Sequence, residues 1–206
     1  MFYNVIIRIA YVLCLLLFNI KFEGLENIPE DEGYILCSNH RTYFDPIFVA
    51  VKIPRSQQLN FMAKEELFKN KFFGWFISKL NAFPISRGKG DSKTLDKSVE
   101  ILKSGQPLLI FIEGTRSKNG VPGRPRSGAS LIAGRAGAGI LPCSVDYGER
   151  LGFRKKVVVK YHPLLTTEDL NIDLESAASL RASSKMVMDS IISGLTHLPE
   201  KEQKQK

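Results

Sequence analysis

The sequence predicts an α/β fold in which a mixed, largely parallel central sheet is flanked by helices. Short apolar runs that are typical of buried strands alternate along the chain with longer segments that are typical of helices. Such alternation indicates an α/β sandwich around a largely parallel sheet. A strongly apolar stretch at residues 2–20 comes before the first strand and adds an N-terminal helix to this prediction.

Six strands are expected, at residues 34–38, 59–63, 82–85, 108–112, 140–145 and 156–161. Helices are expected between and after them, at residues 46–53, 64–80 with a break near Asn70, 92–103, 129–137 and 173–196. At 206 residues the chain is long enough for one domain and an appendage. We predict a membrane-associating helix at residues 1–20, the domain at 21–198 and a solvated tail at 199–206.

The apolar stretch at residues 2–20 is close to the length of about 20 residues that crosses a bilayer. No basic segment precedes it and no small-residue cleavage site follows, which argues against a cleaved signal peptide. Arg8 near one end suits snorkelling, and Tyr3 and Tyr11 suit a membrane interface. Membrane attachment is favoured over a helix packed only on the domain, and spanning and lying in one leaflet both stay open.

Composition narrows the classes of partner. The formal net charge is +8 and the sequence pI is about 9.4, which favours anionic partners such as nucleic acid, lipid headgroups or phosphorylated metabolites. The three cysteines, Cys14, Cys37 and Cys143, are far apart in apolar surroundings, so we expect buried free thiols in a reducing compartment. No second Cys/His pair completes a metal site with Cys37 and His40, and we expect no metal.

His40 and Asp45 are the strongest candidates for catalysis. His40 follows the predicted strand at 34–38, and Asp45 precedes Pro46 at the start of a predicted helix, where Asp45 suits the N-cap. A strand, a tight turn and a helix start could bring the two side chains together, and an imidazole held by a carboxylate is a general base. The alternative is structural: Asp45 only caps the helix and His40 only bonds backbone. Cys37 is disfavoured as a nucleophile activated by His40, because residues three apart on a strand point to opposite faces.

Further polar residues follow other predicted strands, at the edge where ligands bind in α/β folds. Arg87 follows one strand, and Glu113, Gly114 and Arg116 follow the next. The two arginines can each grip a phosphate, and Gly114 lets backbone approach a ligand closely. The alternative is that Glu113 and Arg116 form a local ion pair while Arg87 is solvated.

Two weaker candidates lie beside these residues. Lys64 follows the predicted strand at 59–63 and is a further candidate phosphate contact. Residues 118–126 hold three cations among glycines and prolines. This segment suits a substrate-side loop, a headgroup contact or a solvated loop, and the sequence leaves these three open.

Together these motifs resemble the glycerolipid acyltransferase family, and in particular its 1-acyl-sn-glycerol-3-phosphate acyltransferases. The family's four ordered blocks match residues 39–46, 82–87, 111–117 and 140–145, within a resemblance that spans residues 22–165. The first block, Asn-His-x4-Asp-Pro, and the third, Phe-x-Glu-Gly-Thr-Arg-Ser, are specific when they occur together. The second block departs slightly, since Ala82 stands where glycine is usual and Ser86 where an acidic residue is frequent.

The resemblance implies transfer of a fatty acyl group from a thioester donor to the 2-hydroxyl of 1-acyl-sn-glycerol-3-phosphate, which gives phosphatidic acid in phospholipid biosynthesis. It implies that His40 is the general base and that Asp45 orients it and stabilises the imidazolium. The substrate-binding residues that it implies, together with the weaker candidate named above, are Arg87, Glu113, Gly114, Thr115, Arg116 and Lys64.

The donor is expected to be acyl-carrier protein or coenzyme A thioester, used as a co-substrate, with no cofactor. Thioester donors are intracellular, so the catalytic domain is expected on the cytoplasmic side of an anionic membrane. The alternatives are an acyltransferase for glycerol-3-phosphate or another lysolipid, and more distantly a non-enzymatic basic module that binds membrane or nucleic acid. Nucleic acid is not expected as a partner, because no basic stripe is interleaved with stacking aromatics.

Overall fold

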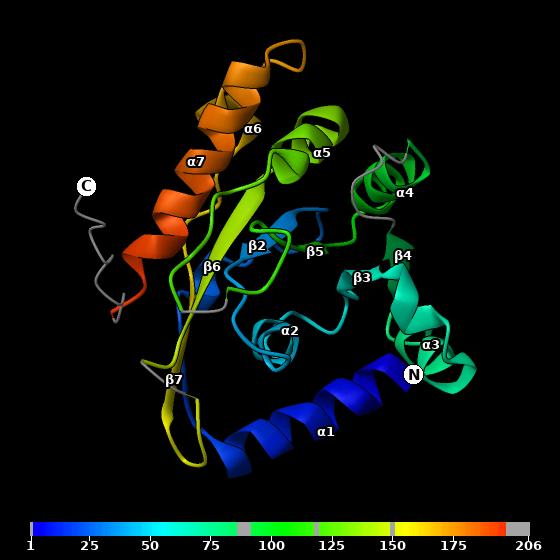
Figure 1. The fold of residues 1–206 in the computed structure, drawn as a ribbon, viewed down its shortest axis with the longest axis vertical. Helices are drawn as coiled ribbons and strands as arrows, with labels where there is room; N and C mark the ends of the chain where they lie inside the picture. Colours follow the sequence, from blue (N-terminus) through cyan, green and yellow to red (C-terminus); the bar gives the residue numbers. More distant parts are fainter. Residues whose placement is uncertain (1, 86–91, 118–119, 149–150, 197–206) are drawn as a thin grey trace, which may run out of the picture.

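The structure is a computed structural model that describes residues 2–85, 92–117, 120–148 and 151–196. Within these residues, seven strands form one sheet in the order β1-β7-β6-β2-β5-β3-β4 (Figure 1). The strands are β1 (Asn19–Glu23), β2 (Ile35–Ser38), β3 (Asn60–Lys64), β4 (Ala82–Ile85), β5 (Leu108–Phe111), β6 (Ile140–Asp146) and β7 (Lys156–Tyr161).

Strand direction confirms the mixed, largely parallel sheet. From β6 through β2, β5 and β3 to β4, every neighbouring pair is parallel. β7 runs antiparallel to β6, and β1 pairs parallel with β7 at the edge of the sheet. The carboxyl ends of β2 and β5 therefore lie side by side, with Ser38 opposite Phe111 in the register. The predicted motifs that follow these two strands meet at this edge.

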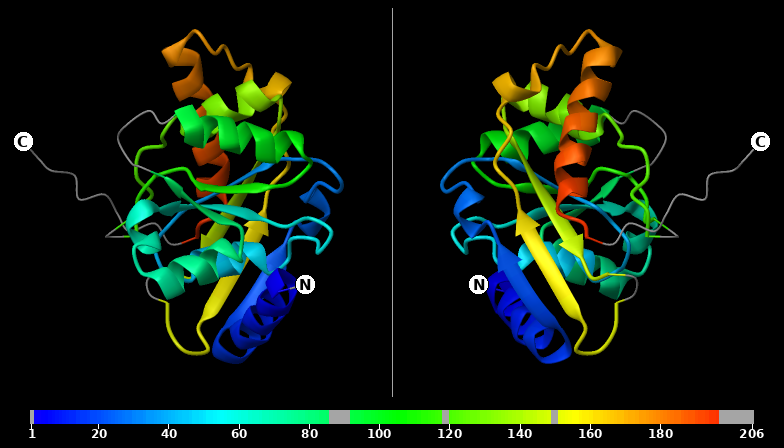
Figure 2. Two further views of the ribbon diagram at one scale, coloured as in Figure 1. Left: turned by 90° about the vertical axis from the view of Figure 1, so that its right-hand side faces the viewer. Right: turned by 90° about the vertical axis from the view of Figure 1, so that its left-hand side faces the viewer.

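Helices cover both faces of the sheet (Figures 1 and 2). Along β2, Leu36 packs into the core shared with α1 and α2, whereas Ile35 and Cys37 pack into the core shared with α4, α5 and α7. This alternation is what a strand buried on both faces requires. The helices are α1 (Phe2–Leu17), α2 (Asp45–Ala50), α3 (Lys71–Ser78), α4 (Ser92–Lys103), α5 (Gly128–Ala136), α6 (Thr167–Leu170) and α7 (Ala177–Ser193), with 3-10 turns η1 (Leu25–Asn27) and η2 (Glu65–Phe68).

The six predicted strands are confirmed to within two residues at their ends. The predicted break near Asn70 is also confirmed, because the Asn70 side chain accepts the Phe73 N–H at 3.0 Å and caps α3. α7 begins later than expected, at Ala177, because the side chain of Ser176 caps it. β1 and α6 were not expected, and the predicted tail at 199–206 lies outside the described residues.

α1 lies along the face of the sheet that α2 also covers, and its two sides differ. Tyr3 and Cys14 are buried against the domain, and Ile7 packs on the same core. The opposite side exposes large apolar side chains, among them Ile9, which is half exposed. α1 is 16 residues long, and in the described part of the chain no helix has the length and apolarity that a membrane crossing requires.

Candidate active site

His40 and Asp45 meet where β2 ends and α2 begins. The Nδ1 atom of His40 lies 3.0 Å from the Oδ2 atom of Asp45. The imidazole also stacks on the ring of Phe111 at the end of β5, with ring centroids 3.9 Å apart and planes 13° apart. The ring is thus held at its edge by a carboxylate and on its face by an aromatic side chain. The predicted convergence of the two residues is confirmed.

Asp45 is buried, and its carboxylate accepts hydrogen bonds from the turn that precedes it. The backbone N–H groups of Arg41 and Thr42 donate to Oδ2 at 2.6 and 2.7 Å, and the Thr42 hydroxyl donates to Oδ1 at 2.8 Å. The predicted N-cap role is wrong. Phe44 occupies the cap position, Asp45 is the first helical residue, and its carboxylate points back to the turn rather than forward into the helix.

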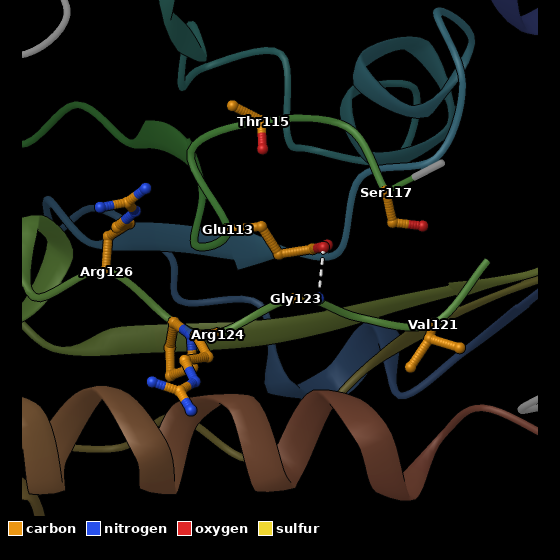
Figure 3. Close-up of a pocket in the computed structure, with 8 residues that line it drawn as sticks. Glu113, Thr115, Ser117, Val121, Gly123, Arg124 and Arg126 are labelled. Atoms are coloured by element: carbon orange, nitrogen blue, oxygen red, sulfur yellow. Dashed lines mark hydrogen bonds between the residues drawn. The ribbon is translucent and has the colours of Figure 1, made fainter. Parts of the chain in front are cut away.

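Glu113, in the third sequence block, holds the main chain of His40. Its Oε1 accepts the His40 N–H at 2.9 Å. Its Oε2 accepts the Gly123 N–H at 2.7 Å, the hydrogen bond that Figure 3 marks. The Ser117 N–H donates to the His40 carbonyl at 2.8 Å, so the loop after β5 holds both backbone groups of His40. Burial raises the pKa of the Glu113 carboxyl above its usual range, and the two N–H donors act in the opposite direction.

Asn39 ties the end of β2 to β6. Its Nδ2 donates to the Val145 carbonyl at 3.0 Å, and its Oδ1 accepts the Val145 N–H at 2.9 Å. The side chain is buried and replaces a pair of backbone hydrogen bonds at the point where His40 turns away from the sheet. The sequence marks Asn39 only as part of the motif, because its partner on β6 is more than one hundred residues away.

A cavity of about 490 Å³ opens beside Glu113. The loop that follows β5 forms it and is closed at its base by a hydrogen bond of 2.8 Å from the Arg126 N–H to the Ile112 carbonyl. Gly114 in this loop has a φ of +72°, a conformation that favours glycine. The lining residues, most of which Figure 3 labels, are Glu113, Thr115, Ser117, Val121, Gly123, Arg124, Pro125 and Arg126.

The cavity places Arg124 and Arg126 beside the predicted substrate-binding residues Glu113 and Thr115. The sequence pointed to their segment, since residues 118–126 are rich in cations, but did not single out these two arginines. Among the described residues of this segment, Val121, Gly123, Arg124, Pro125 and Arg126 line the cavity. Two guanidinium groups beside a cavity of this size suit an anionic ligand.

Arg116 belongs to the same loop but does not line the cavity, and an aromatic side chain holds its guanidinium. Its guanidinium stacks over the Tyr43 ring, 3.8 Å from the centroid, and donates to the Tyr43 hydroxyl at 2.9 Å. The alternative of an ion pair between Arg116 and Glu113 is wrong, because in the described part of the chain the Glu113 carboxylate accepts backbone N–H groups instead. Both Arg116 and Tyr43 are exposed at the surface beside His40.

Lys64 is not part of this cluster. Lys64 ends β3, and its ammonium pairs with Glu66 at 2.9 Å on an exposed surface. Lys64 is not among the residues that line the cavity. Arg87 lies outside the described residues.

The three cysteines are buried and free, as expected. Burial raises the pKa of the Cys14 thiol to about 11 and raises the pKa values of Cys37 and Cys143 further. Cys37 packs among the side chains of the α4, α5 and α7 face, which does not suit a nucleophile. Among the described residues, no group of three or more His, Cys, Asp or Glu side chains is arranged to hold a metal ion.

The family profile described as Acyltransferase matches residues 19–146, which is more than half of the chain and includes His40, Asp45 and the loop through Arg126. This chain belongs to the acyltransferase family. The family resemblance read from the four motif blocks is confirmed, and so is the α/β fold predicted from the alternation of strands and helices.

Individual relatives within the acyltransferase family agree with this assignment. A 1-acyl-sn-glycerol-3-phosphate acyltransferase of Streptococcus pneumoniae is 40% identical over 126 residues, which are 60% of this chain and 46% of that protein. One of Bacillus subtilis is 34% identical over 125 residues, 61% of each chain, and one of Pseudomonas aeruginosa is 37% identical over 148 residues, 69% of this chain and 56% of that protein. The matched part of the chain thus spans about half of these relatives' length.

A solved structure is similar over a longer range. The 1-acyl-sn-glycerophosphate (LPA) acyltransferase PlsC of Thermotoga maritima superposes with a TM-score of 0.74 at 28% sequence identity. The superposition covers 93% of this chain and 77% of that one. The acyltransferase fold therefore extends through nearly the whole chain, beyond the residues that the family profile matches.

Proposed function

We propose that this protein transfers a fatty acyl group from a thioester donor to the 2-hydroxyl of 1-acyl-sn-glycerol-3-phosphate, giving phosphatidic acid. The observation that carries the proposal is the contact of 3.0 Å between His40 Nδ1 and the buried Asp45 carboxylate. Several acyltransferase relatives are named for this acceptor, which supports it over others. The protein then belongs to phospholipid biosynthesis.

His40 acts as the general base. With Nδ1 directed at Asp45, Nε2 is the ring nitrogen that remains to take a proton from the acceptor hydroxyl. Asp45 fixes the tautomer and stabilises the imidazolium that forms, as the carboxylate does in other base–carboxylate pairs. The Phe111 ring beneath the imidazole and the Glu113 contact to its backbone keep His40 in one orientation.

The acceptor oxygen attacks the thioester carbonyl carbon as its proton passes to His40. The tetrahedral intermediate then expels the thiolate, which accepts this proton from the imidazolium and leaves as the thiol. No acyl-enzyme forms, and no protein nucleophile is needed. Backbone N–H groups are the expected donors to the oxyanion. The donor carrier is acyl-carrier protein or coenzyme A.

The acceptor phosphate binds to arginines next to the base. Arg116 is held beside His40 by Tyr43, and Arg124 and Arg126 line the cavity next to Glu113. Guanidinium groups bind phosphate oxygens bidentately, which fixes the glycerol backbone as well as neutralising charge. Glu113, Gly114 and Thr115 then border the glycerol moiety; Arg87 and Lys64 remain predicted phosphate contacts.

α1 lies in the plane of one bilayer leaflet. Its domain-facing side is buried through Tyr3 and Cys14, while the opposite side exposes an apolar stripe. The stripe consists of Val5, Ile9, Val12, Leu13 and Leu16. An apolar stripe with an exposed cation such as Arg8 on the same helix is typical of interfacial helices. The acceptor and the product are both bilayer lipids, and the intracellular donor places the domain on the cytoplasmic side.

An acceptor panel tests the proposal. The purified protein is incubated with 1-acylglycerol-3-phosphate, glycerol-3-phosphate or lysophosphatidylcholine, each with acyl-coenzyme A and with acyl-carrier protein as donor. We expect phosphatidic acid as the main product and little turnover of the other two acceptors. Faster acylation of glycerol-3-phosphate or of the phosphocholine lysolipid would keep the chemistry and refute the acceptor.

A further inference from the structure

α3 presents an aromatic surface that its own domain does not cover. Phe72 is 77% exposed and Trp75 52% exposed, and Leu67 and Phe73 beside them are also exposed. A cluster of large apolar side chains on the surface of a folded domain marks an interaction site. The tryptophan and phenylalanine rings are the side chains most often found at membrane–water interfaces and at protein interfaces.

This surface is continuous with the N-terminal end of α1. The ring centroid of Phe2 lies 6.1 Å from the ring centroids of both Trp75 and Phe76. Figure 1 shows α3 directly beside the N-terminal end of α1. The apolar stripe of α1 therefore continues onto α3 through the contacts of the Phe2 ring.

Another exposed aromatic side chain, separate from those of α3, lies at the C-terminal end of α1. Phe153, in the turn before β7, is 77% exposed. Arg154 fastens this turn to α1, since its N–H donates to the Leu17 carbonyl at 2.7 Å and its guanidinium donates to the Leu15 carbonyl at 3.2 Å. A cation at the end of a helix also satisfies carbonyls that have no helical partner. The turn is thus held at a fixed position relative to α1 (Figures 1 and 2).

Cations surround both aromatic surfaces. Lys69, Lys71 and Lys79 are exposed around α3. Arg154 and Lys155 are exposed next to Phe153. Aromatic side chains with lysines and arginines beside them are typical of surfaces that enter the headgroup region of an anionic bilayer. A protein partner with an apolar groove would need matching acidic groups at two separate places.

We propose that α3 and the turn at residues 151–155 are two further bilayer contacts, one at each end of α1, and that their partner is an anionic lipid surface. This inference rests on the proposed placement of α1 in the bilayer. α1 alone would leave the domain free to rotate about the helix axis, whereas contacts that lie beside the helix, as α3 does, oppose this rotation. The two additional contacts thereby set the orientation of the domain on the bilayer.

Trp75 is the only tryptophan in the sequence, so it reports on α3 alone. The full-length chain is mixed with vesicles of equal parts phosphatidylglycerol and phosphatidylcholine, and tryptophan emission is recorded. We expect emission to move to shorter wavelength and to be quenched when the acyl chains carry bromine. Vesicles of phosphatidylcholine alone should give a weaker change, and added salt should weaken the change with anionic vesicles.

Substitutions test each contact separately in vesicle co-sedimentation. Phe153→Ser and Phe72→Ser should each weaken binding to the anionic vesicles by roughly tenfold, because each removes an exposed ring that the bilayer buries. Met186→Ser is the matched control, since Met186 is an exposed apolar residue on α7, across the sheet from α1. Circular dichroism and thermal unfolding exclude a folding defect, which exposed positions should not produce.

The outcomes separate this inference from the proposed function. Co-sedimentation of the chain with unchanged Trp75 emission would overturn the α3 contact and leave α1 in the bilayer. A dimer in solution with Trp75 already shielded would assign the surface to a second copy and overturn the inference. Vesicle binding with both aromatic contacts confirmed, but without acyl transfer to any acceptor, would refute only the proposed function.

Discussion

Asp45 Oδ2 lies 3.0 Å from His40 Nδ1 and, at the same oxygen, accepts the N–H groups of Arg41 and Thr42. The carboxylate therefore organises the turn and orients the imidazole at the same time. The five-residue spacing has a physical reason, since it is the length of a turn that folds back onto the first residue of a helix. The helix itself begins at Asp45, so the carboxylate is fixed by backbone that packs against the core.

Asp45→Asn should lower kcat by roughly 10³-fold, because the amide cannot stabilise the imidazolium and favours the wrong tautomer. The steady-state rate with the lysolipid acceptor is measured beside the far-ultraviolet circular dichroism of the variant. Thr42→Ser is a matched control that keeps a hydroxyl donor to Asp45 Oδ1 and should retain most activity. A fall of less than tenfold in a folded Asp45→Asn variant would refute the role of Asp45.

Asn39→Ala should lower the free energy of unfolding by about 2–4 kcal/mol, because the Val145 N–H and carbonyl both lose a buried partner. Urea denaturation measures this loss. The variant should also lower kcat more than it changes the acceptor KM, since Asn39 precedes His40 and does not line the cavity. A loss of stability within about 0.5 kcal/mol, as for ordinary surface changes, would contradict this role of Asn39.

Arg116→Lys should weaken binding of the lysolipid acceptor, because lysine cannot make the bidentate contact with phosphate that we propose for Arg116. Lysine also loses the planar stacking on Tyr43 that holds the guanidinium in place. The acceptor KM should rise by roughly 10- to 100-fold, with a smaller effect on kcat. Initial rates over a range of acceptor concentrations separate the two constants. Arg135→Lys, at an exposed position on α5, is the control and should match the unchanged protein.

The burial of His162 leads us to expect a loss of folding stability in acid. It is buried with Nε2 2.6 Å from the Ser144 hydroxyl, and burial lowers its pKa from 6.5 to about 4. The imidazole of His162 binds a proton more readily in the unfolded chain than in the folded chain. The contribution of neutral His162 to the free energy of unfolding is therefore complete above pH 6.5 and is lost as the pH falls toward 4. The loss should be on the order of 2 kcal/mol.

Denaturant unfolding between pH 7 and 4 measures this dependence in the unchanged protein and in His162→Gln, whose amide can still donate to Ser144. The difference in the free energy of unfolding between the two proteins should narrow in acid, because only histidine binds a proton there. Parallel pH profiles would show that His162 does not titrate as its burial requires.

Much of the fold could be predicted because each of the six expected strands is a short apolar or alternating run with a turn at its end. β1 was missed, although Ile20 and Phe22 alternate with polar residues, because its start lies inside the apolar N-terminal stretch. Its partner, β7, is more than one hundred residues further along the chain, and no local pattern indicates that pairing.

The site could be predicted where chemistry and spacing coincide, as at His40 and Asp45. The contacts that hold the site could not. An aspartate before a proline looks the same whether its carboxylate caps a helix or points back to the preceding turn, and only the backbone path decides. Glu113 likewise has an arginine three residues away, yet its carboxylate accepts N–H groups from His40 and Gly123 instead.

The most direct test of His40 as the general base compares the unchanged protein with His40→Ala, using 1-oleoylglycerol-3-phosphate, an acyl thioester and mass spectrometry of the lipid product. We expect phosphatidic acid from the unchanged protein and almost none from the folded variant, because no other described side chain is hydrogen-bonded to Asp45 as a base. Phosphatidic acid formed at a similar rate by folded His40→Ala would show that His40 is not the base.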